Sequence, residues 1–403
     1  MTPKPVEKTE PKLPRRDWVL LPLIALLTVV VLVASVECSV RKFFDEPSQS
    51  ITTCLTPNEA RTSFLGISGC RAQERDRESG SIEYRFDSHG YRNDQDLKPK
   101  QPGVFRIVMT GSSFALAYRV NNADSLASLV PFELSQKTGR EVELYNEGMW
   151  DGFSHVTALR FNDVLSAHPD MVLWMITQHD VMEAGKKLSV SANAPDLRKL
   201  GAKVRDKIER NSGAMSFLDL VSAFASEIAG KSKTAYAVQF VLYRSQTEFL
   251  KGYLAGFDQE NGFLKSQQSQ FWQKQLAQVA TDAADMEFRS RQAGIPFVAV
   301  YVPNRAQAIM VNAGEWPKGY NPYKLDEQLR TIITSHGGIF LDILPGVHGA
   351  PDTGEDFLPV DGHPNALGDA LFARLIAQQL TSGAIPDLAA GKQGIDASAM
   401  RKK

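Results

Sequence analysis

A carboxylate and a histidine lie two residues apart near the C-terminal end of the chain. Asp361 and His363 occur in the stretch 359–373, just before a segment with helical spacing. A histidine that takes a proton from a hydroxyl needs an acid to hold its tautomer, so this pair requires a nucleophile elsewhere. Ser113, which follows an apolar run, is the candidate. These residue types predict acyl transfer through a serine hydroxyl.

The segments that must position these residues alternate between short apolar runs and helical stretches. This alternation begins near residue 104 and is typical of a parallel sheet. The predicted strands are 104–110, 142–146, 171–177, 295–303 and 338–342. The predicted helices are 125–137, one ending near 167, 325–335 and one ending near 380. We therefore expect a three-layer α/β/α domain with a central parallel sheet over residues 104–382.

Polar residues follow several of the predicted strands. Ser113 follows the first, the loop 148–152 follows the second and His179 follows the third, while Asp361 and His363 precede the last helix. Ligands of open α/β sheets bind outside the carboxyl ends of the strands. We expect these four clusters to converge on one site there.

Four stretches carry a family resemblance when they are taken in order. They are FRIVMTGSSFALAYRV, ELYNEGMWDG, HPDMVLWMITQHD and PVDGHPNALGDALFARLI, and IEYRFDSHGYR precedes them. On these stretches the chain resembles the SGNH, or GDSL-like, hydrolase family, and more closely its membrane-anchored bacterial envelope members. The resemblance extends over about residues 82–380 and includes relatives that act in polysaccharide O-acetylation.

The resemblance implies a role for each matched residue. Ser113 would be the nucleophile, and its backbone N–H would donate to the oxyanion. His363 would be the general base, and Asp361 would orient its ring. Gly152 and His179 would supply the other oxyanion donors.

Two positions and one spacing depart from the family pattern. Ser112 stands where the family usually has aspartate, and His179 stands where it has asparagine. An imidazole N–H can also donate a hydrogen bond, so His179 either preserves the oxyanion hole or is a structural residue of its loop. The spacing from Asp361 to His363 is one residue shorter than usual. If Asp361 cannot reach the ring, Asp356 is a nearby substitute.

The N-terminal region predicts a membrane anchor. Residues 18–36 form a run of 19 residues without a charge, which is about the length that a bilayer-spanning helix needs. A cleaved signal peptide or a buried helix is the alternative. Five basic residues lie within 1–17 and two at 41–42, so the positive-inside rule places 1–17 in the cytoplasm. The expected location is the bacterial inner membrane, with one span and the main domain in the periplasm or outside.

The remaining segments complete the expected organisation. Residues 45–103 are polar and rich in turn formers and contain one short strand-like segment, 82–86, so we expect a linker and an entry segment over 37–103. Residues 181–292 lack the strand rhythm and contain an aromatic stripe, which is more often core than binding surface, so we expect an inserted helical cap or lid. Residues 383–403 are expected to be a loose tail.

All three cysteines lie in the first fifth of the chain, at Cys38, Cys54 and Cys70. A thiol nucleophile or a cysteine-based metal site is therefore not expected in the main domain. An outward location would permit a disulfide between Cys54 and Cys70, although free thiols fit the sequence nearly as well.

Composition limits the function classes further. The formal net charge is -1, so the chain lacks the basic field of a nucleic-acid-binding protein. The histidines show no metal-ligand spacing and no phosphate loop is present, so no cofactor is expected. The leading hypothesis is a serine esterase or O-acyltransferase acting on acyl groups, in particular acetyl groups, of envelope carbohydrate; the carbohydrate rests on the resemblance alone.

Two other functions fit the same sequence. One is a non-catalytic carbohydrate-binding or assembly scaffold with a degenerate site, and the other is a lysophospholipase. The expected partners are an acylated carbohydrate or other ester, the membrane, and envelope polysaccharide machinery.

Overall fold

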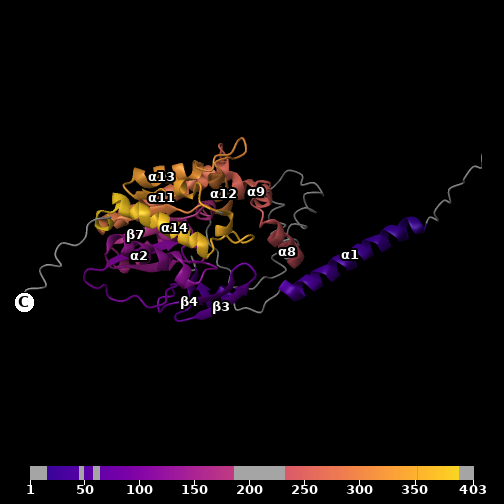
Figure 1. Ribbon diagram of the computed structural model, residues 1–403, viewed down its shortest axis with the longest axis horizontal. Coiled ribbons are helices and arrows are strands. Elements are labelled where there is room, and N and C mark those ends of the chain that lie inside the picture. The colour runs from indigo at the N-terminus through magenta and orange to yellow at the C-terminus, as the bar shows by residue number, and fades with distance from the viewer. Residues whose placement is uncertain (1–15, 45–49, 58–63, 186–231, 352, 390–403) are drawn as a thin grey trace, which may run out of the picture. The chain divides into compact units, whose positions relative to one another are not determined.

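The computed structural model describes residues 16–44, 50–57, 64–185, 232–351 and 353–389 (Figure 1). The chain forms two compact units. The smaller contains Met1–Glu46 and Val204–Gln239, and the larger contains Pro47–Lys203 and Phe240–Lys403.

Five parallel strands form the sheet of the larger unit. In spatial order they are β6 (Val142–Gly148), β5 (Phe105–Gly111), β7 (Met171–Ile176), β8 (Phe297–Tyr301) and β9 (Ile339–Leu341). Every residue of β5, β7 and β8 is buried, because parallel strands in this class are covered on both faces. The prediction of a central parallel sheet is confirmed, and each strand end lies within two residues of its predicted position.

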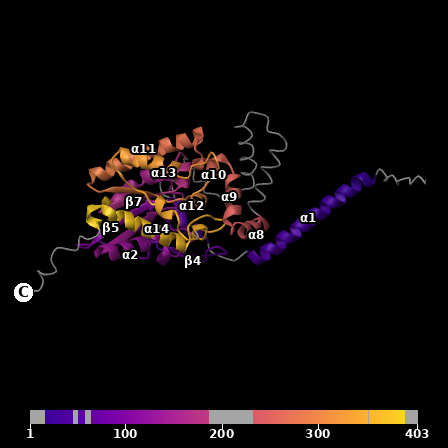
Figure 2. The ribbon, with the colours of Figure 1, turned by 45° about the horizontal axis from the view of Figure 1, so that its top comes forward.

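Helices cover both faces of the sheet (Figures 1 and 2). One layer contains α2 (Leu126–Thr138) and α14 (Ala366–Gln379). The other contains α3 (Ser154–Leu159), α4 (Phe161–Ser166), α11 (Gln270–Gln292) and α13 (Lys324–Ser335). The helix α12 (Arg305–Ala313) contributes to both apolar clusters. Along β5, Ile107 faces the first layer and Val108 the second. The predicted three-layer α/β/α class is therefore confirmed.

Two small antiparallel sheets precede this domain. β1 (Leu55–Pro57) pairs with β2 (Phe64–Gly66), and β3 (Arg71–Asp76) pairs with β4 (Gly80–Arg85). The sequence predicts only one of these strands, at 82–86. A disulfide joins Cys54 to Cys70, which is one of the two states that the sequence left open. The segment is thus a cross-linked structural element that packs on the main domain through Leu116.

The predicted insertion at 181–292 is helical where the structure describes it. It contains α9 (Gln246–Leu254), α10 (Asp258–Asn261) and α11, with α5 (Gln178–Met182) at its start. Residues 186–231 lie outside the described part of the chain. α11 packs in the same apolar cluster as β7 and β8, so this last helix belongs to the outer layer of the sheet.

The expectation of a loose tail from residue 383 is wrong at its start. Ile385 and Leu388 are buried against the cluster that α2 and α14 form. These two apolar side chains lie three positions apart and pack in that cluster. The overall polar composition of residues 383–403 did not indicate that they would be buried. Residues 390–403 lie outside the described part.

The smaller unit contains the apolar helix α1 (Asp17–Phe44). It is long and apolar enough to cross a membrane, and no other helix in the described residues meets that test. The helix continues beyond the predicted end at 36, because no glycine or proline interrupts 37–44. The carboxylate of Glu37 accepts hydrogen bonds from Ser232 Oγ and from the backbone of Lys233 at the start of α8 (Lys233–Leu242).

Candidate active site

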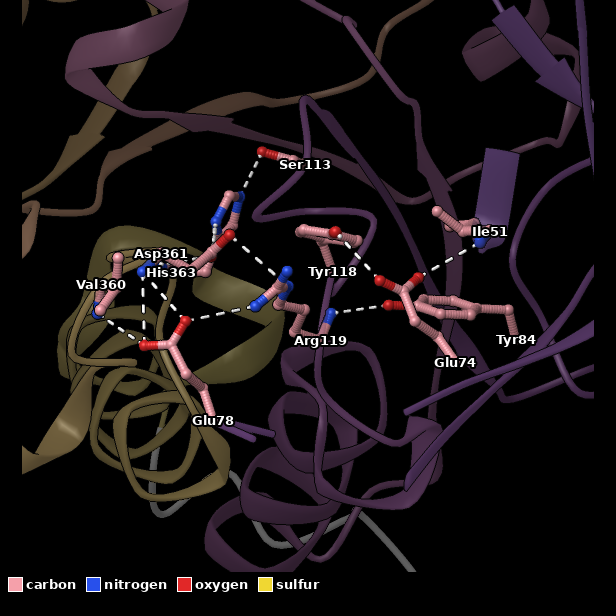
Figure 3. A network of polar contacts seen from close by, with 10 residues as sticks. All are labelled: Ile51, Glu74, Glu78, Tyr84, Ser113, Tyr118, Arg119, Val360, Asp361 and His363. Carbon is pink, nitrogen blue, oxygen red and sulfur yellow. Dashed lines mark hydrogen bonds and ion pairs between the residues drawn. The ribbon is translucent and has the colours of Figure 1, made fainter. Parts of the chain in front are cut away.

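Ser113, His363 and Asp361 form a continuous chain of hydrogen bonds (Figure 3). Ser113 Oγ lies 2.7 Å from His363 Nε2, and His363 Nδ1 lies 2.5 Å from Asp361 Oδ1. Asp361 therefore reaches the ring across the short spacing, and Asp356 is not the ring's partner. The structure thus brings together the three residues that the sequence predicted as nucleophile, base and orienting acid.

A glycine makes the turn that presents Ser113. Gly111 ends β5 with φ 148°, a backbone region that essentially only glycine occupies. A Cβ atom at this position would also lie 2.6 Å from the carbonyl oxygen of Met175. The chain can therefore turn sharply at the carboxyl end of β5. The backbone N–H of Ser113 donates to no group among the described residues.

The loop after Ser113 is held by one buried arginine. Ala117 and Arg119 adopt left-handed backbone conformations, with φ 58° and 63°, and such conformations persist only where surrounding contacts enforce them. The guanidinium of Arg92 donates to the carbonyl oxygens of Leu116, Ala117 and Val120. Burial lowers the pKa of Arg92 to about 10, so it stays charged at neutral pH. Arg92 thus fixes the loop that carries the serine.

The ring of His363 is held between two aromatic side chains of that loop. Its centroid lies 4.9 Å from Phe114 and 5.1 Å from Tyr118. The backbone carbonyl of His363 accepts the N–H of Leu358 at 2.9 Å. Two residues further on, Asn365 caps α14 by accepting the N–H of Leu367. These contacts restrict the imidazole to the orientation in which Nε2 faces Ser113.

Asp361 is held in its ionised form. Burial alone would raise the pKa of Asp361, but the hydrogen bond and charge of His363 and the charge of Arg119 hold it below its ordinary value. An ionised carboxylate only accepts hydrogen bonds, so the proton between the two groups belongs to Nδ1. In the neutral imidazole Nε2 is then the acceptor, and the Ser113 hydroxyl donates to it.

These groups open on a cavity of about 310 Å³. Aromatic rings from several elements contribute much of its wall, among them Trp150, Phe153 and Phe249. Phe249, from the predicted aromatic stripe, is buried in the core and also lines this cavity. This one residue of the stripe therefore belongs to both the core and the site.

The predicted oxyanion residues fall in different surroundings. His179 lines the cavity, and its ring packs 5.2 Å from that of Phe153. The N–H of Gly152 instead donates to the carbonyl of Met149 at 3.2 Å, within its own turn. The structure therefore brings Ser113 and His179 to the cavity and directs the Gly152 N–H elsewhere.

Thr177 and Asp180 cap the start of α5, whose first two residues, Gln178 and His179, line the cavity. Thr177 and Asp180 form a reciprocal capping box, in which Asp180 accepts the Thr177 N–H at 2.7 Å. Burial raises the pKa of Asp180 to about 6, although hydrogen bonds from Thr177 and Ser112 oppose the rise. Ser112, which follows Gly111 directly, thus connects the turn that carries Ser113 to the start of α5.

Gln178 lies beside His179 in this turn and was not predicted. It lines the cavity, and its side-chain oxygen is buried without a hydrogen-bond partner among the described residues. Its position next to His179 is the only signal in the sequence, since glutamine has no titratable group. The described residues contain no cluster of three His, Cys, Asp or Glu side chains that could hold a metal ion.

No protein-family model and no curated protein sequence matches the chain. Solved structures with a similar fold include TesA, with 11% identity and a TM-score of 0.35 over 68% of this chain and 97% of TesA. A lipase/acylhydrolase from Enterococcus faecalis matches with 15% identity and a TM-score of 0.33 over 68% and 95% of the two chains. A mutant of Axe2, an acetyl-xylooligosaccharide esterase from Geobacillus Stearmophilus, matches with 12% identity and a TM-score of 0.36 over 68% and 94%. Likeness at this level assigns neither a family nor an activity.

Proposed function

We propose that the protein is a serine esterase or O-acyltransferase whose nucleophile is Ser113. The observation that carries this proposal is the unbroken hydrogen-bonded chain from Ser113 Oγ through both ring nitrogens of His363 to Asp361. A serine hydroxyl is a weak nucleophile at neutral pH and needs such a base. Ser113 follows the carboxyl end of β5 and lines a cavity, and ligands of open α/β sheets bind at such strand ends.

Acylation follows from this geometry. As Ser113 Oγ attacks the ester carbonyl carbon, its proton passes to His363 Nε2, and the carbonyl becomes a tetrahedral oxyanion. Asp361 stabilises the imidazolium that forms. The Ser113 N–H is available to donate to the oxyanion. When the carbon–oxygen bond to the leaving group breaks, His363 returns the proton to the departing alkoxide, and an acyl-Ser113 ester remains.

Deacylation repeats the same proton transfers with a new nucleophile. A water molecule gives up a proton to His363 Nε2 and attacks the acyl carbon, the bond from that carbon to Ser113 Oγ then breaks, and His363 returns the proton to Oγ as a free acid leaves. A sugar hydroxyl in place of the water gives a new ester by the same steps. The acyl-enzyme is common to both outcomes. The aromatic wall of Trp150, Phe153 and Phe249 suits a pyranose ring or a short acyl group, which supports an acylated carbohydrate as substrate.

A second candidate is a non-catalytic carbohydrate-binding scaffold. The hydrogen bond from Gly152 N–H to Met149 favours it, because an oxyanion hole then needs a side-chain donor from residues 178–179. One such donor contributes about 10²- to 10³-fold to kcat. The enzyme assignment predicts that His179→Ala or Gln178→Ala lowers kcat by this factor, whereas the scaffold predicts that both variants and the wild type have equally negligible turnover.

We also propose that α1 anchors the protein in the inner membrane with the larger unit outside. The uncharged run of residues 18–36 and the basic residues before it support this orientation, and the Cys54–Cys70 disulfide suits an oxidising compartment. Cys38 is exposed and free. A membrane-impermeant maleimide added to intact spheroplasts should label Cys38, and labelling only after lysis would contradict the orientation.

The enzyme assignment can be tested on the full chain in detergent micelles. A fluorophosphonate should label the wild type, and p-nitrophenyl acetate should be hydrolysed. Ser113→Ala should abolish both reactions, and His363→Ala should slow them by several orders of magnitude. Absence of Ser113-dependent labelling, together with absence of turnover, would contradict the proposed function.

A further inference from the structure

A buried carboxylate, Glu78, reaches the candidate site from the hairpin that β3 and β4 form (Figure 3). Glu78 lies in the turn between β3 and β4, and its side chain is 1% exposed. Its Oε1 accepts the N–H of Val360 at 2.5 Å, and its Oε2 accepts the N–H of Asp361 at 3.2 Å. The hairpin turn therefore binds the backbone of the residue that orients His363.

Arg119 connects this carboxylate to the side chain of Asp361. Its Nη1 lies 3.3 Å from Glu78 Oε2, and its Nε lies 3.5 Å from Asp361 Oδ2. The carboxylates of Glu78 and Asp361 are both largely buried and repel each other, and the positive charge of Arg119, which pairs with both, offsets that repulsion. Since Arg119 faces Oδ2, the other oxygen of Asp361 is left to the imidazole.

The same hairpin also positions Arg119 and the surroundings of the imidazole. The N–H of Arg119, whose backbone is left-handed, donates to the hydroxyl of Tyr84 on β4 at 3.0 Å. The hydroxyl of Tyr118, whose ring packs on His363, donates to Glu74 on β3 at 3.3 Å. One hairpin thus contacts both the carboxylate side and the aromatic side of the Asp361–His363 pair.

We propose that Glu78 and Arg119 are positioning residues for the reaction of Ser113. They act through Asp361: Glu78 fixes the backbone of 360–361, and Arg119 compensates the charge of Glu78 and holds Oδ2. This inference rests on the proposed function and adds to it a charged support in which Glu78 comes from outside the α/β domain and Arg119 from within it. A misplacement of about 1 Å at such a site can cost about 100-fold in rate.

The charges around His363 make the proposal testable through pH. The nearest are Asp361 on its own loop, Arg119 on the nucleophile loop and Glu78 on the hairpin. Tyr118 lies beside the ring. Asp151, His179 and Arg305 line the cavity across from it. Within the part of the chain that the structure describes, Glu78 and Arg119 contact Asp361 without lining the cavity.

Removing either charge should shift the activity profile in a direction fixed by its sign. Burial raises the pKa of Glu78, and the N–H of Val360 and the charge of Arg119 oppose that rise and favour its ionised form. From that form Glu78→Gln removes a negative charge, so the imidazolium is stabilised less and the acidic limb of the rate profile moves to lower pH. Arg119→Gln removes a positive charge, so the limb moves to higher pH. A residue that merely supports the fold would not produce opposite shifts.

The measured quantity is the second-order rate constant for fluorophosphonate labelling of Ser113, in the full chain in detergent, between about pH 5 and 9. Both glutamine variants should lower the plateau by about 10- to 100-fold. The plateau rate constant of the double variant should fall by less than the product of the two single-variant factors, because the two residues act together. Glu83→Gln and Arg85→Gln on β4 are matched controls, since both side chains are exposed, and they should label like the wild type.

The outcomes separate this inference from the proposed function. If Glu78→Gln and Arg119→Gln label at the wild-type rate with the wild-type profile, while Ser113→Ala is unlabelled, the function stands and the inference is wrong. If the wild type itself is unlabelled, both are wrong. Thermal unfolding measures whether each glutamine variant is folded. If one is not, Glu78→Asp and Arg119→Lys retain the charges, and the acidic limb of their rate profiles should lie at the wild-type pH. A shifted limb in those variants would overturn the inference.

Discussion

Ser113 and His363 are separated by 250 residues in the chain, yet Ser113 Oγ lies 2.7 Å from His363 Nε2. The contact joins segments from the beginning and the end of the domain in sequence: the turn after β5 carries the serine, and the loop before α14 carries the histidine. Asp361 holds the opposite side of the ring at 2.5 Å. The consequences below follow from this arrangement and from the packing that maintains it.

Asp361→Asn should leave the fold intact and remove most of the activity. An amide in place of the carboxylate favours the wrong tautomer of His363, and comparable changes in serine hydrolases lower kcat by about 10⁴-fold. The measurement is kcat for p-nitrophenyl acetate, with Asp342→Asn as control because Asp342 pairs with Arg330 away from the cavity. Full activity in Asp361→Asn would show that the carboxylate does not orient the ring.

Gly111→Ala should destabilise the protein strongly. The change combines an unfavourable backbone conformation with a Cβ atom 2.6 Å from the Met175 carbonyl oxygen, so we expect a loss of about 3 kcal/mol or more in the free energy of unfolding. Gly103→Ala is the matched control. Gly103 also has positive φ but no neighbour within 4 Å of the added Cβ, so its loss should be about 1 kcal/mol. Equal losses in urea denaturation would refute the close contact.

Removal of the Cys54–Cys70 disulfide should lower stability by about 3 kcal/mol, as the chain-entropy model gives for a loop of this length. Because the cross-linked segment carries the hairpin with Glu74 and Glu78, we also expect slower labelling of Ser113 in Cys54→Ser/Cys70→Ser. Cys38→Ser, which changes an exposed free thiol, is the control. Alkylation of both Cys54 and Cys70 in unreduced wild-type protein would contradict the disulfide.

Glu147 should make stability fall as pH rises. Burial and the charge of Asp163 raise the pKa of Glu147 to about 8 from its ordinary 4.5. Between these values the native state holds a proton that the unfolded chain has lost, so the free energy of unfolding decreases by up to about 1.4 kcal/mol per pH unit. Glu147→Gln should remove this slope, and the exposed Glu141→Gln should retain it. Parallel pH profiles for the wild type and Glu147→Gln would contradict the raised pKa.

The sheet could be predicted from sequence because its strands are buried on both faces. Such strands appear as uninterrupted apolar runs, which is why the ends of β5, β7 and β8 lie within two residues of their predicted positions. β3 could not be predicted in this way. It contains Arg71, Glu74 and Arg75, and its stability comes from pairing with β4 and from a small apolar cluster that only the folded chain assembles.

Some residues of the candidate site could likewise be predicted from sequence, and others could not. Ser113, His363 and Asp361 could be predicted because their residue types, order and positions after strands carry information. Glu78 could not, because its contact with Asp361 spans 283 residues and depends on where a hairpin turn meets a distant loop. Arg119 depends further on a left-handed backbone, which no local pattern of non-glycine residues predicts.

The central claim is that Ser113 carries the acyl group during turnover. The most direct measurement is peptide mass spectrometry of the full chain after brief incubation with p-nitrophenyl acetate and acid quenching. We predict one acetylated peptide that contains Ser113, and we predict that it is absent from Ser113→Ala and formed far more slowly in His363→Ala. Turnover that persists in Ser113→Ala, or an acetyl group located only on other residues, would contradict the account.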